Sequence, residues 1–561
     1  MGLKMTNREI ARIFDHIADM LQFKDENPFK VRAYRQAASS IYHLDEDLHY
    51  LHEKDRLDEI PGIGKAIKGK IEELLTKGTC DYYEILLREV PEGLFEMLAI
   101  PGVGFKTIKI LYEKMGISNR EELLQAAQDK RIRLLPGMGG KTEYGIIKGI
   151  EMLDKTSDKN TLGFVLPIAE DLLEYLRECP QVLLSSLVGS IRRGKPLVTD
   201  IDILVASHAE DLVRAYASKY RSAKKISADE PGHIAGYLQF NIPFEIIIVD
   251  TEDYFAGLFR STGSKEHVDH LLRGRSAAIL ENARSEAEIY ERCQLDYIPP
   301  ELREDQGEME AAANAEIPHL IDLTDLQGDL HVHSSWSDGA SSIEEMVEAA
   351  RKLKYSYLAI TDHSRSLALS GGLNEERLAA QGVEIDHMNK RLQDFKVFKG
   401  TEVDIMKDGT LDYSAELLRG LDVVIASIHT NFHLDREQQT ARIIAAIKDD
   451  DVDMIGHMSG RLLNRRPAYE LDVDRILEEA AKNQVILEIN SHPDRLDIDA
   501  EIARKAKDYG IKVSINSDGH HKNDLKLVRY GILNARRGWL EKKDVINCLS
   551  QQEIKKYFRP E

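Results

Sequence analysis

The sequence has few cysteines and no long apolar segment, and both absences narrow the class of protein. Its four cysteines (Cys80, Cys179, Cys293 and Cys548) are scattered without a CxxC pair, which excludes a disulfide framework and a thiolate zinc site. No run approaches the ~18 apolar residues of a membrane span, and residues 1–10 lack the apolar core of a signal peptide. We therefore expect a protein of the reducing cytoplasm with no membrane partner.

Positive charge is also scarce. The chain carries 75 Lys and Arg against 96 Asp and Glu, a net charge of −21. Residues 1–155 are nearly balanced, with 24 basic and 26 acidic residues, so the acidic excess lies in residues 156–561. Because non-specific DNA affinity comes mainly from phosphate neutralisation, this balance argues against indiscriminate coating of DNA. It is compatible with local DNA sites and with acidic clusters that hold cations.

Three Pro-Gly turns punctuate a helical N-terminal region. They are Pro61-Gly62-Ile63-Gly64, Pro101-Gly102-Val103-Gly104 and Pro136-Gly137-Met138-Gly139, each between apolar residues and a basic helix-forming stretch. Glycine lets the backbone approach closely, and the next helix presents its N-terminal N–H groups to a phosphate. We predict contacts with the DNA backbone, without sequence specificity, from Gly62, Gly64, Lys65, Lys68, Gly102, Gly104 and Lys106. The alternative is that the turns only connect helices.

Two aspartates follow a Gly-Ser turn near the middle of the chain. A predicted buried strand leads into Gly189-Ser190-Ile191-Arg192-Arg193-Gly194, and the next predicted strand carries Asp200 and Asp202. Residues i and i+2 of a strand share a face, so the two carboxylates project together and favour a bound cation, Mg²⁺ or Mn²⁺. Gly189, Ser190 and Arg193 are candidates for holding a triphosphate. The alternative is a pair of solvated carboxylates.

These residues resemble the nucleotidyltransferase palm of family X DNA polymerases. The resemblance extends to Ala33-Tyr34-Arg35-Gln36-Ala37-Ala38, which is similar to that family's lyase domain, and to Thr262-Gly263-Ser264-Lys265, which is similar to its nucleotide-contacting motif. It implies that the partners are dNTPs and gapped or primer–template DNA. The roles it implies are catalysis by Asp200, Asp202 and Glu245, nucleotide contacts by Gly263 and Lys265, a Schiff base on Lys70 and a phosphate contact by Lys30.

The sequence departs from the family pattern at several positions. Glu245 is a longer carboxylate where the family has a third metal-binding aspartate, and Arg260-Ser261 replaces an aromatic pair. Val268 and Thr199 stand where the family has asparagine and glycine. Because an octahedral magnesium site tolerates little misplacement, these departures predict a less efficient polymerase.

Candidate metal ligands recur in the last third of the chain. From Gly328 onward, seven short apolar runs end in polar side chains and alternate with amphipathic helical segments. This alternation predicts βα units whose polar residues lie at the carboxyl ends of parallel strands, where a barrel builds its active site. Imidazole and carboxylate ligands suit Mn²⁺, Zn²⁺ or Fe, and so many ligands suit more than one ion. Any one of these histidines alone is as well explained as an ordinary core or surface residue.

The set resembles the polymerase and histidinol phosphatase (PHP) domain, a distorted seven-stranded barrel with a trinuclear site. The resemblance implies that Glu402 bridges two ions and that a third is held separately. The nine implied ligands are His331, His333 and Asp518 on one side of Glu402, His429 and His457 on the other, and Asp338, His363 and His520 around the third ion. Arg461, Arg465 and Arg466 are candidate phosphate contacts.

A family X palm followed by a PHP domain resembles the bacterial and archaeal PolX architecture over nearly the whole chain. It implies a monomeric, multidomain α/β DNA repair enzyme that joins gap-filling polymerisation to a Mn²⁺-dependent 3′–5′ exonuclease. The expected domains are lyase-like helices with the first hairpin (1–85), fingers-like helices with two hairpins (86–155), an α+β palm (156–255), a thumb (256–315), a linker (316–327) and a PHP barrel (328–561). The polar, acidic stretch 303–316 also reads as a linker.

Three other functions stay open at this point. The palm could be a structural DNA clamp for a PHP nuclease, as Glu245, Arg260 and Ser261 allow. The protein could be a small-molecule phosphoesterase of histidinol-phosphatase type, although such an enzyme has no need for three DNA-backbone turns. It could also be a non-catalytic DNA-binding module, against which the complete set of nine ligands speaks.

Overall fold

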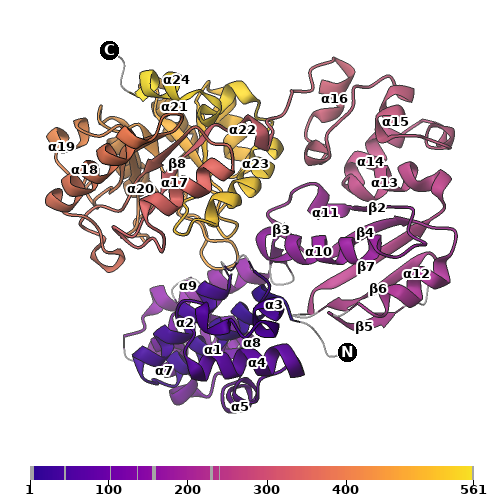
Figure 1. Cartoon of the computed structure of the whole chain (residues 1–561), viewed down its shortest axis with the longest axis horizontal. Helices are drawn as coiled ribbons and strands as arrows, with labels where there is room; N and C mark the ends of the chain where they lie inside the picture. Colours follow the sequence, from indigo (N-terminus) through magenta and orange to yellow (C-terminus); the bar gives the residue numbers. More distant parts are fainter. Residues whose placement is uncertain are drawn as a thin grey trace.

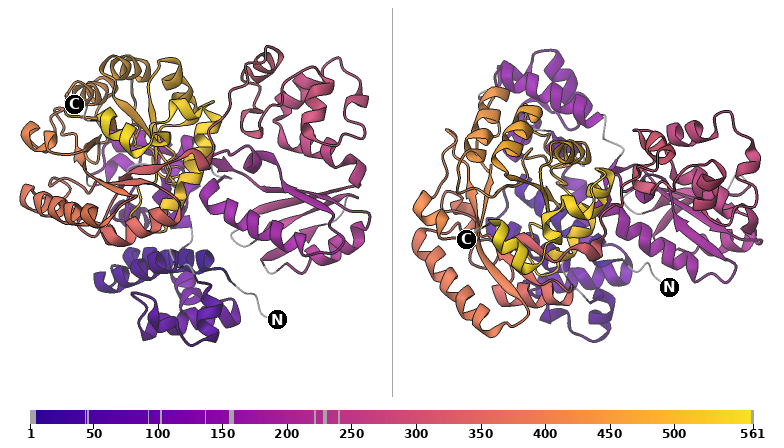
Figure 2. Two further views of the ribbon diagram at one scale, coloured as in Figure 1. Left: turned by 45° about the horizontal axis from the view of Figure 1, so that its top comes forward. Right: turned by 90° about the horizontal axis from the view of Figure 1, so that it is seen from above.

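The computed structural model arranges the chain as three bodies that meet near the centre (Figure 1). The structure describes residues 5–42, 44, 46–91, 93–100, 103–135, 137–154, 159–220, 222–227, 231–238 and 241–558. Figure 2 shows the N-terminal helices on one side of a C-terminal barrel, and a mixed sheet with its following helices on another side. This confirms the predicted multidomain α/β fold class.

The N-terminal body is helical, as its lack of strand-like alternation predicts. Its buried apolar side chains form one cluster that runs from Met5 to Ile150, so a single core serves both predicted helical domains. Gly62, in the first Pro-Gly turn, has φ of +81°, a conformation that favours glycine. The helices are α1 (Asn7–Phe23), α2 (Pro28–Tyr42), α3 (Leu48–Glu53), α4 (Lys65–Lys77), α5 (Asp81–Glu89), α6 (Gly93–Glu96), α7 (Phe105–Met115), α8 (Arg120–Gln128) and α9 (Gly140–Asp154).

The middle body holds a five-stranded mixed sheet in the order β2-β4-β7-β6-β5. The two central strands, β4 and β7, run parallel, while the other neighbours pair antiparallel. A short helix, α11 (Gly189–Arg192), follows β2 at the Gly-Ser turn. The strands are β2 (Leu184–Leu187), β4 (Ile201–Ala206), β5 (Ala223–Ser227), β6 (His233–Leu238) and β7 (Pro243–Val249), with α10 (Leu162–Arg177) and α12 (Glu210–Ala217) packed around them.

Four helices after the sheet form a separate small core: α13 (Tyr254–Thr262), α14 (Lys265–Leu272), α15 (Glu286–Arg292) and α16 (Glu308–Ala313). The prediction of a linker across 303–316 is wrong, because α16 lies in this stretch and two charged side chains of the stretch are buried against residues from earlier in the chain. Arg303 is fully buried against Glu286. Glu308 is equally buried and accepts hydrogen bonds from His267 and from two backbone N–H groups. Residues beyond it lie against the barrel, where the Ile321 N–H donates to the Leu540 carbonyl.

The C-terminal body is a parallel barrel, as the seven apolar runs predict. Its sheet has the order β14-β13-β12-β11-β10-β9-β8, and a bridge between Val332 and Gly519 brings the two edge strands together. The strands are β8 (Gly328–Val332), β9 (Tyr357–Ile360), β10 (Lys396–Asp404), β11 (Val423–Ser427), β12 (Met454–Ile455), β13 (Ile486–Asn490) and β14 (Val513–Asn516). The helices are α17 (Ile343–Lys352), α18 (Glu375–Arg391), α19 (Ala415–Arg419), α20 (Arg436–Ile447), α21 (Val473–Asn483), α22 (Ala500–Asp508), α23 (Val528–Arg537) and α24 (Gln551–Phe558).

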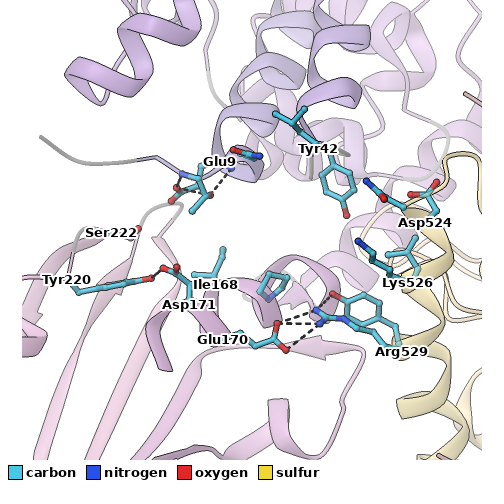
Figure 3. Close-up of a pocket in the computed structure, with 17 residues that line it drawn as sticks. Glu9, Tyr42, Ile168, Glu170, Asp171, Tyr220, Ser222, Asp524, Lys526 and Arg529 are labelled. Carbon is cyan, nitrogen blue, oxygen red and sulfur yellow. Dashed lines mark hydrogen bonds and ion pairs between the residues drawn. The ribbon is translucent and has the colours of Figure 1, made fainter. Parts of the chain in front are cut away.

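The barrel packs closely on the mixed-sheet body. Leu496, Leu527 and Tyr530 of the barrel belong to the same buried cluster as the core of the sheet. A Cβ on Gly163, at the start of α10, would lie 2.1 Å from Pro493, so only glycine fits there. A cavity of about 450 Å³ lies where all three bodies meet (Figure 3). It is lined by Glu9 and Tyr42 of the helical body, Glu170 of the mixed-sheet body and Arg529 of the barrel. In the part of the chain that the structure describes, no helix is long and apolar enough to cross a membrane.

Candidate functional site

The predicted barrel ligands converge on one buried carboxylate, Glu402, at the end of β10. Its Oε1 lies 2.8 Å from His457 Nε2 and 3.3 Å from His429 Nε2. Its Oε2 lies 2.8 Å from His363 Nδ1, 3.5 Å from His331 Nε2 and 3.6 Å from His333 Nε2. The two oxygens of Glu402 therefore face different sets of imidazoles, which is the arrangement that a bridging carboxylate requires.

Asp518, after β14, completes the group around His331 and His333. Its Oδ1 lies 3.1 Å from His333 Nε2 and 3.5 Å from His331 Nε2, while its Oδ2 accepts a hydrogen bond from the Asn490 side chain. One oxygen thus faces the imidazoles and the other is held by the protein. Ligand atoms of His331, His333 and Asp518 all lie within 4.8 Å of one another.

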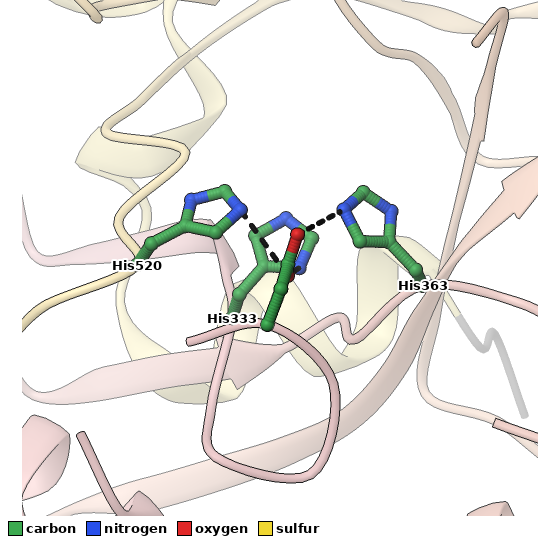
Figure 4. A group of neighbouring side chains, drawn as sticks. His333, His363 and His520 are labelled. Atoms are coloured by element: carbon green, nitrogen blue, oxygen red, sulfur yellow. Dashed lines mark ion pairs between the residues drawn. The ribbon is translucent and has the colours of Figure 1, made fainter. Parts of the chain in front are cut away.

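A second group surrounds Asp338, in the loop after β8. His520 Nε2 lies 3.3 Å from Asp338 Oδ1 and His363 Nε2 lies 3.5 Å from Asp338 Oδ2. Figure 4 shows His520, His333 and His363 coming together from three different segments of chain, and ligand atoms of these histidines and of Asp338 lie within 4.8 Å of one another. The structure therefore brings all nine predicted ligands together, and it places His333 and His363 between the two groups.

Burial and opposite charges shift the pKa values of these side chains strongly. Burial lowers the pKa of His333 to about 3, helped by the neighbouring His520 and His363. Burial also disfavours the charged form of His429, but Glu402 and Asp404 overcome it and raise the pKa of His429 to about 10. The surrounding histidines hold the pKa of Glu402 well below its usual range despite its burial. Glu402 is therefore ionised among the surrounding imidazoles.

The polar atoms of the cluster fit metal ions. Among the described residues, His333 Nδ1 and His457 Nδ1 are buried without a hydrogen-bond partner. An unpaired buried polar atom costs about 1–3 kcal/mol, so a native site gathers several of them only where another partner is expected. The imidazole and carboxylate donors suit Mn²⁺, Zn²⁺ or Fe.

The mixed sheet brings a second acidic group together. Asp202 on β4 and Glu245 on β7 are direct neighbours in the parallel register, and Asp200 immediately precedes β4 rather than lying within it. Burial, together with Asp200 and Glu245, raises the pKa of Asp202 to about 7, and burial and Glu245 also raise the pKa of Asp200. A Cβ on Gly189 would lie 2.1 Å from Asp202 Oδ2, so glycine is required beside this carboxylate.

The residues predicted to hold a triphosphate differ in how far they are available. Ser190 Oγ is buried without a hydrogen-bond partner in the described part of the chain. Lys265 is exposed, and Gly263 immediately precedes the Ser264 that caps its helix. Arg193, in contrast, donates to Glu304 Oε1 (2.9 Å) and to the Thr262 carbonyl (2.8 Å).

Glu304 is a site residue that the sequence reasoning missed. Its carboxylate also accepts from Lys195 (2.8 Å) and from Arg537 of barrel helix α23 (3.1 Å). Burial opposes its ionisation, but these cations lower the pKa of Glu304 to about 2. The sequence indicated only a linker at Glu304, because its three partners are 109 to 233 residues away along the chain. It joins the Gly-Ser turn, the small helical core and the barrel.

The basic residues of the helical body form two groups. Lys30 and Lys70 both lie over the ring of Tyr82, with their Nζ atoms 5.2 Å and 4.8 Å from its centre. Lys65 and Lys106, after the first two turns, are exposed, whereas Lys68 pairs with Asp55 and Asp58. Gly64 and Gly104 precede α4 and α7. The predicted contact Gly102 lies outside the described residues.

Two of the arginines predicted to contact phosphate at the barrel, Arg461 and Arg466, make contacts within the protein. Arg461 donates to the carbonyls of Arg495 and Leu496 and pairs with Asp499, so its role is to hold a loop. Arg466 donates to the Gly460 carbonyl and lies over the Phe432 ring. Two buried carboxylates outside the nine predicted ligands also bond to ligand histidines: Asp404 to His429, and Glu488 to His331.

Known protein families match the two ends of the chain. A helix-hairpin-helix domain matches residues 5–80, a SAM-like helix-hairpin-helix tandem matches residues 95–151, and the PHP domain matches residues 329–492. The fold and the metal-ligand cluster thus define a multidomain PHP protein with helix-hairpin-helix units.

Similarity to individual proteins narrows this class. The chain is 36% identical over 572 residues to the DNA polymerase/3′–5′ exonuclease PolX of Bacillus subtilis (strain 168), covering 99% of this chain and 100% of that protein. It therefore belongs to the PolX family, as its motifs predict. Proteins named as probable phosphatases match between 34% and 41% of the chain. One from Caldanaerobacter subterraneus is 33% identical over 34% of it, and one from Escherichia coli (strain K12) is 29% identical over 34%. These matches cover 75% and 78% of those proteins.

Proposed function

We propose that this protein is a DNA repair enzyme that joins template-directed gap filling to 3′–5′ removal of nucleotides. The observation that carries the proposal is the presence, on one PolX chain, of the nine-residue cluster around Glu402 and the acidic trio beside Gly189. The proposed parts are the lyase-like and fingers-like helices (1–85 and 86–155), a palm (156–255), a thumb (256–315), a connection (316–327) and the barrel (328–561). We further propose that it acts as a cytoplasmic monomer on gapped or primer–template DNA.

Phosphodiester hydrolysis is assigned to the barrel. His331, His333, Glu402 and Asp518 would hold one ion, Glu402 with His429 and His457 a second, and Asp338, His363 and His520 a third. Such ions supply a hydroxide nucleophile and stabilise the oxygens of the phosphodiester. The protein contributes a buried set of imidazole and carboxylate donors that converge on Glu402, and each imidazole would hold its ion in the neutral form.

Nucleotidyl transfer is assigned to the palm. Asp200, Asp202 and Glu245 would hold Mg²⁺ or Mn²⁺, which offsets the mutual repulsion that raises the pKa of Asp202. Glu245 Oε1 lies 2.7 Å from His233 Nδ1, and this hydrogen bond helps to orient the carboxylate. Gly189, Ser190, Gly263 and Lys265 would bind the triphosphate of a dNTP.

Arg193 is assigned to the same triphosphate, but its donors are engaged by Glu304 and Thr262. For Arg193 to bind the triphosphate, its guanidinium would have to leave the Glu304 carboxylate. The Arg193–Glu304 pair and the longer side chain of Glu245 together favour a second candidate function, in which the palm adds nucleotides poorly and mainly holds DNA for the barrel.

Contact with DNA is assigned to the helical body. Lys65 and Lys106 lie at the N-termini of α4 and α7, which suit backbone phosphates, and Lys68 lies one turn further along α4. The other proposed contacts are the glycines of the Pro-Gly sequences, Gly62, Gly64, Gly102 and Gly104. Lys70 is the proposed Schiff-base lysine and Lys30 its neighbouring phosphate contact. Their shared position over Tyr82 supports a common role.

The test compares hydrolysis of 5′-labelled DNA with hydrolysis of a small phosphomonoester in Mn²⁺, using the wild type and His333→Ala. We expect the wild type to shorten DNA from its 3′ end, with little action on the phosphomonoester, and His333→Ala to lose the shortening. A surface variant, Glu478→Gln on α21, serves as control. Preference for the phosphomonoester would contradict the proposal and favour a phosphatase.

A further inference from the structure

Glu488 is a buried carboxylate of β13 that lies outside the nine proposed ligands. Its side chain is fully buried. Its Oε1 lies 2.7 Å from His331 Nδ1 and accepts a hydrogen bond from the Asn516 side chain at 2.9 Å. Its Oε2 accepts a hydrogen bond from the His457 backbone N–H at 2.8 Å. Both oxygens are therefore used, and each holds a different ligand residue.

The bond to His331 determines which ring nitrogen faces the cluster. A carboxylate oxygen can only accept, so Nδ1 of His331 carries a proton, and Nε2 is the nitrogen whose lone pair the neutral ring would offer to an ion. That lone pair is directed to the space between Glu402 and Asp518, each 3.5 Å away. An imidazole that donates to a carboxylate is also a more basic ligand. Glu488 thus sets both the tautomer and the donor strength of His331.

The bond to His457 acts on the backbone instead. His457 follows a strand of only two residues, β12, and has φ of +25°, a conformation that non-glycine residues rarely adopt. Its Nε2 lies 2.8 Å from Glu402 Oε1. The hydrogen bond from the His457 N–H to Glu488 helps hold this backbone in place, and with it the imidazole on the far side of Glu402.

We propose that Glu488 is the positioning residue of the two ion sites that share Glu402, because it orients His331 for one and His457 for the other. The proposal rests on the proposed metal-dependent function of the barrel. Asp338, His363 and His520 have no contact with Glu488 among the described residues, so the third site does not depend on it. Asp404 has a narrower role, since it bonds to His429 Nδ1 alone among the proposed ligands (3.0 Å).

The test uses Glu488→Gln, which keeps the shape but replaces one oxygen with an amide donor. Facing the His457 N–H and the Asn516 amide, this group cannot accept every bond that the carboxylate accepts. Metal-free full-length protein is titrated with Mn²⁺, and bound metal is measured by equilibrium dialysis and elemental analysis. We expect three ions per wild-type chain, and affinity reduced about 10- to 100-fold at two of them in Glu488→Gln.

Two matched variants sharpen this comparison. Asp404→Asn should weaken one site only, and the surface variant Glu478→Gln should match the wild type. Electron paramagnetic resonance gives a readout beyond activity: two Mn²⁺ ions bridged by Glu402 give an exchange-coupled spectrum, which Glu488→Gln should replace with that of isolated ions. Excess Mn²⁺ should restore both the coupled spectrum and hydrolysis.

Each other outcome has a distinct meaning. Wild-type affinity and a coupled spectrum in Glu488→Gln would overturn the proposal. Failure of the wild type to bind Mn²⁺ would instead overturn the metal-dependent function on which it rests. Glu488→Met fills the same volume without an amide donor and should show the same loss. Melting of both variants far below the wild type, measured by circular dichroism, would show that Glu488 supports the fold rather than the ligands and would also overturn the proposal.

Discussion

Replacing Asp202 with asparagine should stabilise the palm in the absence of divalent metal. Burial beside Asp200 and Glu245 raises the pKa of Asp202 from 3.8 to about 7. A folded-state pKa above the unfolded one means that ionisation destabilises the fold, and this penalty grows as the pH rises from about 4 to 7. A difference of this size corresponds to about 4 kcal/mol. Asparagine resembles the protonated acid, so the variant should gain up to about 4 kcal/mol at pH 8 and almost nothing at pH 4.

Hydrogen exchange of the β4 and β7 amides measures this local stability within the intact chain. In chelator at pH 8, Asp202→Asn should slow their exchange relative to the wild type. Mg²⁺ should slow exchange in the wild type and have little effect in the variant, because the cation relieves the same repulsion. Equal exchange in the two proteins, with no response to Mg²⁺, would refute the assignment of Asp200, Asp202 and Glu245 as a cation site.

Three further predictions concern the separate activities. Glu245→Asp should raise the rate of nucleotide addition if the long carboxylate is what weakens the palm, and single-nucleotide incorporation assays would show no gain if the palm only holds DNA. Glu304→Gln should release Arg193 and lower the Kd for a dNTP by about tenfold, or about 1.4 kcal/mol, in a fluorescence titration; an unchanged Kd would mean that Arg193 does not bind the triphosphate. His333→Ala should abolish primer shortening while leaving nucleotide addition intact, and loss of both in the same gel assay would show that the two sites are not independent.

Local patterns allowed the barrel and its ligands to be predicted. In each βα unit the strand, the ligand at its end and the helix are adjacent in sequence. His331, Glu402 and His457 could therefore be recognised without knowing how the strands pair. The family resemblance, with alternation along residues 244–249, also indicated Glu245, whereas its parallel pairing with Asp202 is seen only in the structure.

Long-range charge pairing could not be predicted in this way. Glu304 and Arg303 read as parts of an acidic linker, because the partners that bury them, Arg193 and Glu286, lie elsewhere in the sequence. Glu488 ends no apolar run and matches no motif, and its bonds to His331 and His457 exist only once β8, β12 and β13 lie side by side. The sequence shows that such residues are charged, but it does not show which oppositely charged residues pair with them.

The central claim is that one chain both extends and shortens a primer, at two separate sites. The most direct measurement follows the length of a 5′-labelled primer in gapped DNA with Mn²⁺ and all four dNTPs, for the wild type and for Asp200→Ala/Asp202→Ala. We predict that the wild type extends the primer before shortening it and that the double variant only shortens it. Shortening without any extension in the wild type, unchanged in the double variant, would contradict the claim and leave a nuclease whose palm holds DNA.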